Sequence, residues 1–467
     1  MESTSYKKAS TFYLIGNLFN RGIAFLTVPI FTRVLSTIDY GIVTTYNSWV
    51  VILAMIIGFA THMGIRSAFV DYRKEIDDVM SITTTFVLLV GSIFSVFIGL
   101  FLLFLEISFP ISLVILCILQ GLFSAVLENY SMYLMMQYKY KFRTALMILP
   151  NLISVCLSMI TIIFFLKSKL YMGRIVATAV VTIGFGVLVI LLIYKKSKML
   201  FNNKYLKYIL TISSPLILHG IALNILSQSD RTMITWLADA SQTGIYSLVY
   251  NFSMLATVIT TALDGVWIPW FTGKLKAGDK NSINKMSIRY INLITYAMFA
   301  LILVGPEVIK VLASSEYWEG IYIIPPAVLA NYVIFAYTLY VNIEHFYKKT
   351  FFITINTLIA AITNIILNYF FIPQYGYIAA AYTTLFSYLV AFVLHARYAK
   401  KLSFGLYPLK IFIKPLIHIV FSVSIFYLFM DKLILRWGLV ILYLSIIFFQ
   451  NRKDIRKLFP SLRKYKE

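Results

Sequence analysis

Residues 174–194 read RIVATAVVTIGFGVLVILLIY, a run that carries no charge after Arg174. Lys195, Lys196 and Lys198 follow it directly. A helix of about 20 residues rises roughly 30 Å, which matches the hydrocarbon core of a bilayer. A membrane β-strand would instead alternate polar and apolar residues over about 10 positions. The run therefore predicts a transmembrane helix.

Similar runs recur along the whole chain of 467 residues, of which 60% are hydrophobic, with a mean hydropathy of +0.83. This composition excludes a soluble multidomain protein and predicts an all-α polytopic membrane protein. The connections between runs are short, the longest being 62–80 and 272–289, so no inserted soluble domain is expected. The pattern predicts about 14 transmembrane helices, at 12–36, 40–60, 81–105, 110–136, 144–166, 174–194, 208–237, 244–271, 290–312, 321–345, 350–372, 377–397, 411–429 and 433–450.

The positions of the basic residues explain the formal charge of +22. Of the 41 Lys and Arg residues, about 32 lie at the ends of the runs that share a side with the amino terminus, and about 7 lie at the opposite ends. Only Arg21 and Arg231 lie inside runs. This positive-inside pattern predicts that both termini are cytoplasmic, and it argues against a nucleic-acid partner. Cys117 and Cys156 lie in apolar runs and are expected in the core, with no metal-binding spacing to the histidines.

An internal repeat with an offset of about 204 residues organises the chain. Gly16 matches Gly220, Asn20 matches Asn224, and the pair Tyr46-Asn47 matches Tyr250-Asn251. Each unit has six predicted helices, so an axis along the membrane normal relates the two units, as in transporters that rock between states. The predicted domains are an amino-terminal lobe at 1–205, a second lobe at 206–402, and two further helices with a basic tail at 403–467.

Polar stripes mark helices at matching positions of the two repeats. An intramembrane charge costs roughly 2.5 to 3.5 kcal/mol, so such residues usually face a cavity or a partner. At any one position the stripe can also serve to hold helices together. The stripes are Asn17, Asn20 and Arg21; Thr44, Asn47 and Ser48; Asn224, Ser227, Gln228, Arg231 and Thr235; and Tyr250, Ser253, Thr257, Thr260, Thr261 and Asp264.

These stripes predict one central cavity between the lobes. Arginine binds phosphate oxygens in a bidentate manner, and amides and hydroxyls suit sugar hydroxyls, so the cavity is expected to hold a phosphorylated sugar. The substrate-binding candidates are Arg21, Arg231, Arg66, Asn17, Asn20, Asn47, Asn224, Gln228, Thr257 and Thr261.

Carboxylates also lie inside the predicted helices. Asp230 and Asp264, with Glu344 as a third, are candidates for coupling transport to a proton or sodium gradient. Alternatively, these carboxylates neutralise the arginines, for example through an ion pair between Arg21 and Asp230 or Asp264. No other cofactor is expected.

The chain resembles the Wzx-type polysaccharide biosynthesis flippases, which export O-antigen or capsule repeat units and belong to the multidrug/oligosaccharidyl-lipid/polysaccharide exporter superfamily. The resemblance covers essentially the whole chain. It rests on Gly16-Asn17, Asn20-Arg21-Gly22, Pro29, Thr32-Arg33, Leu35-Ser36 and Tyr40-Gly41; on Ser229-Asp230-Arg231, Gly244-Ile245-Tyr246 and Tyr250; and on Tyr347-Lys348-Lys349-Thr350, Asn364, Asn368-Tyr369, Pro373, Tyr375-Gly376 and Ala379-Ala380-Ala381.

This resemblance implies alternating access by two six-helix lobes, with a polyprenyl-diphosphate-linked oligosaccharide as cargo. It further implies a bacterial inner (cytoplasmic) membrane protein that is a monomer surrounded by membrane lipids, with a polysaccharide polymerase and chain-length machinery as partners. Arg21 and Arg231 are the implied cations of the cavity. Arg33 and Arg66 lie close to helix ends, which departs from a deep site with several arginines.

Two related functions compete with this interpretation. A peptidoglycan lipid-precursor flippase would share the architecture and the lipid carrier. A cation-coupled multidrug exporter should place carboxylates deep in its first lobe, whereas 12–36 and 40–60 contain none. A membrane scaffold or polymerase would not require matching polar stripes, and an enzyme is not expected, because the sequence shows no nucleophile–base pair, metal cluster or phosphate loop.

Overall fold

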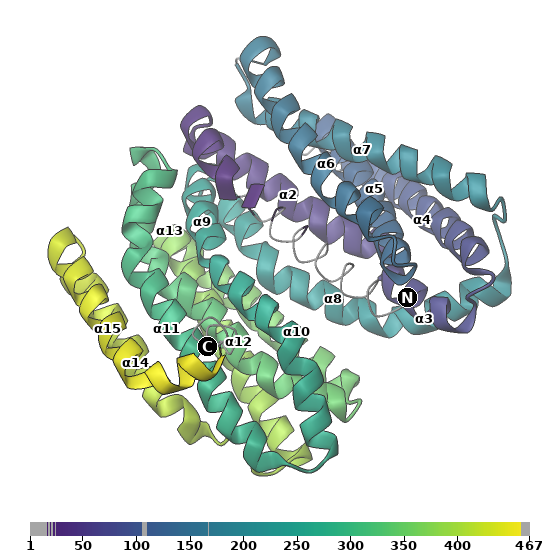
Figure 1. Cartoon of the computed structure of the whole chain (residues 1–467). Helices are drawn as coiled ribbons and strands as arrows, with labels where there is room; N and C mark the ends of the chain where they lie inside the picture. The colour runs from purple at the N-terminus through teal and green to yellow at the C-terminus, as the bar shows by residue number, and fades with distance from the viewer. Residues whose placement is uncertain are drawn as a thin grey trace, which may run out of the picture. The chain divides into compact units, whose positions relative to one another are not determined.

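A computed structural model describes residues 25–104, 110–166 and 168–458, together with residues 16, 19, 22 and 23. Every regular element within these residues is a helix (Figure 1). In this part of the chain, nine helices are long and apolar enough to cross a membrane, or up to eleven if each of two bent pairs forms one span. The all-α fold class is confirmed, and the count of 14 spans stays a prediction.

Each predicted span from 40–60 onward falls on one or more observed helices. A short apolar helix, Phe25–Val34, precedes them. The elements are α2 (Thr37–Gly58), α3 (Thr61–Asp71), α4 (Ile76–Phe104), α5 (Ile111–Met136), α6 (Tyr140–Ile160), η1 (Thr161–Phe165), α7 (Leu170–Lys196), α8 (Asn203–Leu237), α9 (Ala240–Ser253), α10 (Leu255–Lys276), α11 (Lys280–Leu312), η2 (Ser315–Ile323), α12 (Ile324–Phe346), α13 (Thr350–Leu402), η3 (Leu409–Phe412), α14 (Ile413–Leu428) and α15 (Leu433–Leu458).

The described residues pack into two compact units. Unit 1 contains Met1–Leu248, Leu312–Tyr317 and Thr350–Ser387, and unit 2 contains Val249–Val311, Trp318–Lys349 and Tyr388–Glu467. The predicted lobes at 1–205 and 206–402 were derived from the sequence repeat, whereas these two units are defined by packing. The division into lobes therefore stays a prediction.

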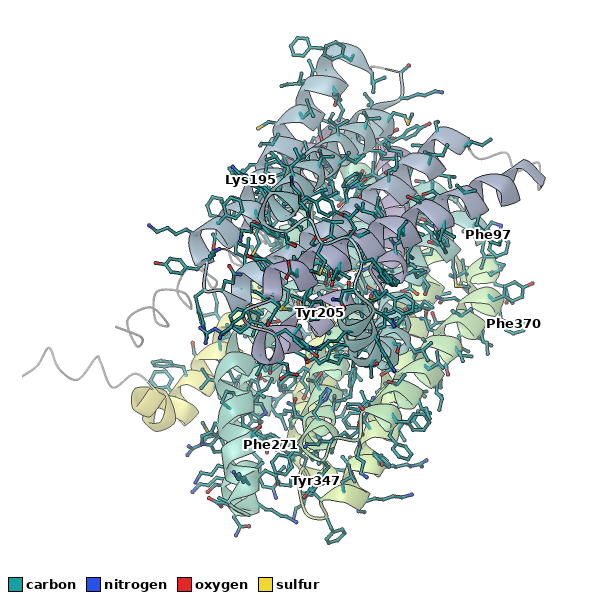
Figure 2. The ribbon with its side chains drawn as sticks, turned by 90° about the vertical axis from the view of Figure 1, so that its right-hand side faces the viewer. Phe97, Lys195, Tyr205, Phe271, Tyr347 and Phe370 are labelled. Atoms are coloured by element: carbon teal, nitrogen blue, oxygen red, sulfur yellow. The ribbon has the colours of Figure 1, made fainter. Side chains whose placement is uncertain are left out.

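In unit 1, α2 packs against both α5 and α8 (Figure 1). A Cβ on Gly121 of α5 would lie 2.9 Å from the Cβ of Leu53 on α2, so this glycine lets the two helices approach closely. Apolar side chains cover the outer surface of the unit. Phe97 is 66% exposed and Phe370 is 61% exposed, and both project outward (Figure 2). Such a surface suits a lipid environment.

In unit 2, aromatic side chains fill much of the core. Trp267 of α10 lies against Tyr290 of α11, with ring centroids 4.9 Å apart. Tyr443 of α15 stacks on Phe299 of α11, and Arg436 forms an ion pair with Glu307 of α11. The last helix, which has no partner in the predicted repeat, is therefore anchored on α11.

Helix α13 consists of two antiparallel arms that meet at Gly376. This glycine has φ 58° and ψ −144°, which are not helical values. Residues on either side of it pair with each other: Asn364 Nδ2 donates to Thr384 Oγ1 at 3.1 Å, and Thr383 Oγ1 donates to Asn368 Oδ1. The two arms correspond to the predicted helices at 350–372 and 377–397.

Three expectations were wrong. The segment 62–80, expected as a connection, contains helix α3, because Phe59 and Ala60 adopt left-handed φ values and the chain restarts a helix after them. The segment 272–289 is also mostly helical, since α10 ends at Lys276 and α11 begins at Lys280. Cys117 is buried as expected, but Cys156 is exposed, because it lies on the span Tyr140–Phe165, where only 17% of the most apolar window is buried.

Candidate functional site

The predicted stripe of the first helix cannot be placed. Asn17, Asn20 and Arg21 lie outside the described residues. Their role in the cavity stays a prediction, as does the ion pair proposed for Arg21.

Arg231 lies in unit 1 on the face of α8 that meets α2. It is only 5% exposed, and its guanidinium donates to Gln228 Oε1 at 3.0 Å and to the Ser227 carbonyl at 3.2 Å. The same Gln228 oxygen accepts a hydrogen bond from Ser48 of α2 at 3.1 Å. The structure therefore brings Arg231 and Gln228 together and connects them to the stripe of α2.

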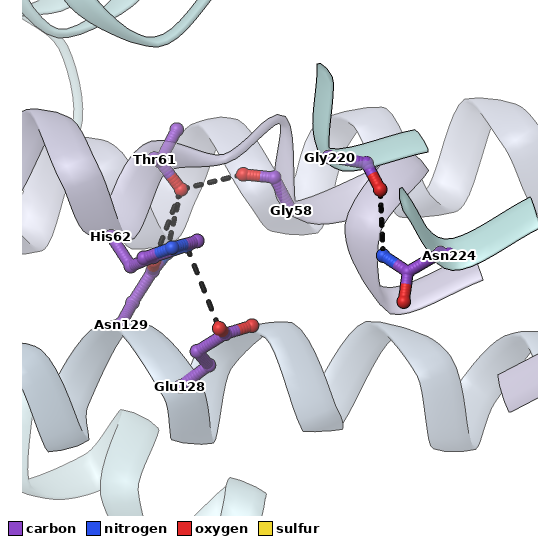
Figure 3. A network of polar contacts seen from close by, with 7 residues as sticks. All are labelled: Gly58, Thr61, His62, Glu128, Asn129, Gly220 and Asn224. Atoms are coloured by element: carbon purple, nitrogen blue, oxygen red, sulfur yellow. Dashed lines mark hydrogen bonds and ion pairs between the residues drawn. The ribbon is translucent and has the colours of Figure 1, made fainter. Parts of the chain in front are cut away.

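Other members of these two stripes contribute to helix packing. Thr45 of α2 and Thr235 of α8 share a hydroxyl hydrogen bond of 2.7 Å. Asn224 donates to the carbonyl of Gly220 in its own helix at 3.0 Å (Figure 3). The Thr45–Thr235 bond thus holds α2 and α8 together, which is the alternative that the sequence left open, whereas the bond of Asn224 stays within α8.

The remaining candidates of unit 1 are exposed. Asn47 lies on α2 and Arg66 lies on α3, and both side chains are accessible. Near Arg66, Thr61 and Asn129 exchange hydrogen bonds of 3.1 and 2.8 Å, and His62 lies 3.7 Å from Glu128 (Figure 3). These contacts fix α3 on α5 and leave Arg66 accessible.

The candidates of unit 2 lie on α10. Thr257 donates to the Met254 carbonyl at 2.7 Å, and Thr261 donates to the Thr257 carbonyl at 2.5 Å. Asp264 accepts a hydrogen bond from Tyr290 at 3.1 Å. The two hydroxyls are therefore bonded within their own helix.

Asp230 is the centre of a buried polar network in unit 1. Its side chain is 1% exposed, although it neighbours Arg231 in the sequence. Consecutive residues of a helix point about 100° apart, so Asp230 faces α9 and α13 rather than α2. Its carboxylate accepts hydrogen bonds from Tyr246 at 2.5 Å, Asn368 at 2.7 Å and Thr384 at 2.7 Å. All three donors are neutral.

A second layer of oxygen-bearing side chains surrounds this carboxylate. Asn364 Oδ1 accepts from Ser229 at 3.2 Å and from Asn368 at 3.2 Å. Amide, hydroxyl and carboxylate oxygens are the ligands that hard cations prefer. Hydroxyls and a carboxamide of this kind can therefore either solvate the carboxylate or coordinate a cation that binds to it.

These partners of Asp230 were missing from the predicted site. Asn364 and Asn368 stand four residues apart in an apolar run, which was a signal for one polar helix face. The sequence could not show that this face meets Asp230, which lies 138 residues before Asn368.

Unit 2 holds a different buried carboxylate. Glu344 of α12 and His395 of α13 are 0% exposed, and His395 Nδ1 lies 3.1 and 2.9 Å from the two carboxylate oxygens. The ring of Tyr337 stacks on the imidazole with centroids 5.5 Å apart. His395 was not among the predicted site residues, because the residues before it, Ala391 to Leu394, are all apolar and form no polar stripe with it.

The fold of the chain is similar to that of several solved membrane transporters. A structure of the lipid II flippase MurJ in an inward closed conformation has a TM-score of 0.60 and 19% identity, covering 95% of this chain and 99% of that chain. A MOP superfamily transporter from Pyrococcus furiosus has a TM-score of 0.57 and 15% identity, covering 85% and 96%. A mutant of the MATE transporter VcmN from Vibrio cholerae has a TM-score of 0.53 and 13% identity, covering 86% and 99%. The chain is a multi-pass membrane protein with the MOP transporter fold.

A sequence comparison identifies the family. The model of the family described as polysaccharide biosynthesis protein matches residues 7–273, which is more than half of the chain, so the protein belongs to this family. No curated protein matches the sequence. The family recognised from the sequence motifs is confirmed.

Proposed function

We propose that this protein is a flippase that moves polyprenyl-diphosphate-linked oligosaccharide repeat units of a surface polysaccharide, such as O-antigen or capsule, between bilayer leaflets. The observation that carries the proposal is membership of the polysaccharide biosynthesis family together with a transporter fold. A polysaccharide precursor attached to a lipid carrier is a cargo that fits both the family and the fold.

Arg231 supports an anionic headgroup as cargo. It is a buried cation in the last third of α8, and its guanidinium donates hydrogen bonds to neutral groups of the same helix. A guanidinium can offer a diphosphate two parallel hydrogen bonds, and the neighbouring amides suit sugar hydroxyls. The cargo would enter from the cytoplasmic leaflet and leave on the outer side of a bacterial inner membrane. The basic residue distribution supports this orientation, with both termini cytoplasmic.

Deletion of the gene in its host tests this proposal. Lipid-linked oligosaccharides and surface polysaccharide are quantified in the deletion strain and after complementation. A full repeat unit should accumulate on its lipid carrier, with loss of surface polymer, and the wild-type chain should reverse both effects. Unchanged lipid-linked sugars with accumulation of a cationic dye would replace the proposal by a drug exporter. Accumulation of a peptidoglycan precursor would replace it by the other flippase.

Variants of the arginines locate the headgroup site. At equal expression, Arg21→Ala and Arg231→Ala should fail to complement, and Arg231→Lys should complement in part, because it keeps the charge and loses the bidentate geometry. Lys310→Ala, a substitution near the end of α11, serves as the control and should complement fully. Full complementation by both Arg21→Ala and Arg231→Ala would contradict a cationic cavity.

We also propose that Asp230 couples transport to a cation gradient. Its neutral oxygen-bearing neighbours favour sodium over a proton, since no histidine or second carboxylate takes part in the network of described residues. Transport should rise with sodium at constant pH in the wild-type chain, and Asp230→Asn should abolish this dependence. Asp264→Asn, at the other candidate carboxylate, should keep the sodium dependence, whereas loss of the dependence in this variant would move the coupling site to α10. Dependence on pH alone would assign a proton to the site instead.

A further inference from the structure

The connection between α7 and α8 in unit 1, residues 197–202, exposes apolar side chains outside the two membrane spans that it joins. Its sequence is SKMLFN. Leu200 is 58% exposed and Phe201 is 71% exposed, and we call these two residues the apolar pair. Helix α7 ends at Lys196 and α8 begins at Asn203, so the apolar pair lies at the surface of the bilayer and not in its hydrocarbon core.

Hydrogen bonds at both ends fix the conformation of this connection. The backbone is extended at Ser197 and at Asn202. Ser197 Oγ donates to Asp78 at 2.5 Å and accepts from the backbone N–H of Met199 at 3.2 Å. Asn202 Oδ1 accepts from the backbone N–H of Lys204 at 3.0 Å. The exposure of the apolar pair is therefore a fixed feature of the fold.

Lysines flank the apolar pair on both sides. Residues 195–208 contain five lysines and no carboxylate (Lys195 and Tyr205 are labelled in Figure 2). Lys196 donates to the hydroxyl of Tyr133 at 2.6 Å, and the Lys204 ammonium lies 5.0 Å from the ring centroid of Tyr72. The other three are exposed and form no hydrogen bond or ion pair with the part of the chain that the structure describes: Lys195, Lys198 and Lys207. Three ammonium groups thus remain to bind an anion.

Carboxylates at the same end of unit 1 leave an excess of positive charge. Residues 71–78 and 195–208 together contain seven basic residues and four carboxylates. Three of these carboxylates accept hydrogen bonds from hydroxyl groups: Asp71 from Tyr208, Asp77 from Tyr133 and Asp78 from Ser197. The three lysines without partners therefore face an anion from outside the chain.

We propose that the connection between α7 and α8 is a binding site for anionic phospholipid headgroups, with the apolar pair in the boundary between headgroups and acyl chains. Both helices enter the bilayer beside it, so headgroups are within reach of the lysines. Lysine clusters next to a membrane span attract anionic leaflets, and apolar side chains flanked by lysines suit the interface. The connection also joins the two predicted repeats, so bound lipid holds this joint at the predicted cytoplasmic surface.

Quenching by brominated lipid tests the site in vesicles. Phe201 is replaced by Cys in a chain with Cys117→Ser and Cys156→Ser, and a fluorophore is attached to the new thiol. The vesicles contain equal parts of phosphatidylglycerol and phosphatidylcholine, and one of the two lipids carries bromine on its acyl chains. The quenching should show a preference for phosphatidylglycerol of roughly five-fold or more, since each lysine at an anionic surface contributes a factor of about that size. Equal quenching by the two lipids, or quenching by neither, would overturn the proposal.

Neutral variants show whether the three lysines bind the headgroup. The test variant combines Lys195→Gln, Lys198→Gln and Lys207→Gln. The matched control neutralises three exposed lysines of unit 2 by Lys276→Gln, Lys285→Gln and Lys401→Gln. At equal amounts of folded protein, the test variant should lose the preference for phosphatidylglycerol and the control should keep it. A preference that survives in the test variant would contradict this site.

Thermal unfolding in detergent distinguishes a lipid from a free anion. Phosphatidylglycerol should raise the unfolding midpoint of the wild-type chain, because a ligand that binds the folded state stabilises it. Phosphatidylcholine and inorganic phosphate at the same concentration should not. Leu200→Ser with Phe201→Ser should reduce the shift by at least half. The lipid site is refuted if inorganic phosphate gives the same shift, or if phosphatidylglycerol gives none. Neither measurement involves transport, so failure of the proposed cargo would not affect these outcomes.

Discussion

Asp230 in unit 1 and Glu344 in unit 2 are equally buried carboxylates that are stabilised by different chemistry. Asp230 receives three hydrogen bonds from neutral side chains, one each from Tyr246, Asn368 and Thr384. Glu344 has one imidazole, that of His395, across both of its oxygens. Three neutral donors therefore stabilise the Asp230 carboxylate, whereas one imidazole stabilises the Glu344 carboxylate.

Because of this difference, Asp230 can exchange its hydrogen-bond partners, whereas Glu344 keeps its one partner. Neutral hydroxyls and amides can turn from solvating a carboxylate to coordinating a cation, at little electrostatic cost. A buried carboxylate that loses the imidazole bonded to it is left without compensation. We therefore expect Asp230 to serve transport and the Glu344–His395 pair to hold α12 against α13.

Loss of the imidazole should have the largest effect on stability. His395→Leu leaves Glu344 buried without a partner, and the free energy of unfolding should fall by about 3 to 5 kcal/mol. Unfolding by SDS in mixed micelles measures this change. The double variant Glu344→Leu with His395→Leu should cost much less, because neither polar group remains. Equal losses in the single and double variants would show that the contact between the imidazole and the carboxylate is not what stabilises the packing of α12 against α13.

Removal of the charge on Asp230 should have a smaller effect. Asp230→Asn keeps the shape of the side chain but turns charge-assisted hydrogen bonds into neutral ones, at a cost of about 1 to 3 kcal/mol. The same SDS titration measures it, and Asp264→Asn, with its one hydrogen bond from Tyr290, should cost less. A loss as large as that of His395→Leu would remove the distinction between the two carboxylates.

The turn at Gly376 joins the two arms of α13. One arm carries Asn368, which bonds Asp230, and the other carries His395, which bonds Glu344. Gly376→Ala drives a Cβ into Gln242 Oε1 at a residue with φ 58°, so we expect a loss of about 1 to 2 kcal/mol. Gly184→Ala on α7 is the control and should change stability by less than about 0.5 kcal/mol. Equal stability of both variants would show that the turn tolerates a side chain.

Asp279, between α10 and α11, is an exposed carboxylate, and its substitution should have the smallest effect on stability. Hydrogen bonds from Lys274 and Ser282 lower its pKa from 3.8 to about 2. A depressed pKa stabilises the fold above the unfolded value, and this contribution is lost as the pH falls from 3.8 towards 2. The difference in unfolding midpoint between Asp279→Asn and the wild type should therefore be slight at neutral pH and vanish in that interval. A difference that grows on acidification would contradict this sign.

The helices were predictable because each apolar run is long enough to need lipid or a protein core. The turn at Gly376 was predictable for the same reason, since Pro373 and Gly376 separate two such runs. Helix α3 was missed because its charged residues, Arg66 and Asp71, made the segment look like a connection. A helix can continue outside the apolar region when its backbone bonds are internal.

Single residues of the site were predictable, but the contacts between them were not. Asp230 and Arg231 were recognisable because charges inside apolar runs are costly. Their partners were not, because Asn368 and Thr384 reach Asp230 across 138 and 154 residues of sequence. The sequence also could not show which members of a polar stripe pack helices. Thr45 does so through Thr235, whereas Asn47, two residues further along α2, is exposed.

Movement of a polyprenyl-diphosphate-linked oligosaccharide across a bilayer by the purified protein tests the proposed function most directly. The lipid-linked oligosaccharide is incorporated into proteoliposomes, and a sugar-modifying enzyme outside the vesicles measures how fast the inner pool becomes accessible. Wild-type protein should make the inner pool accessible at least ten times faster than protein-free vesicles, and Arg231→Ala should remove most of this gain. Equal rates with and without the wild-type protein would contradict the flippase.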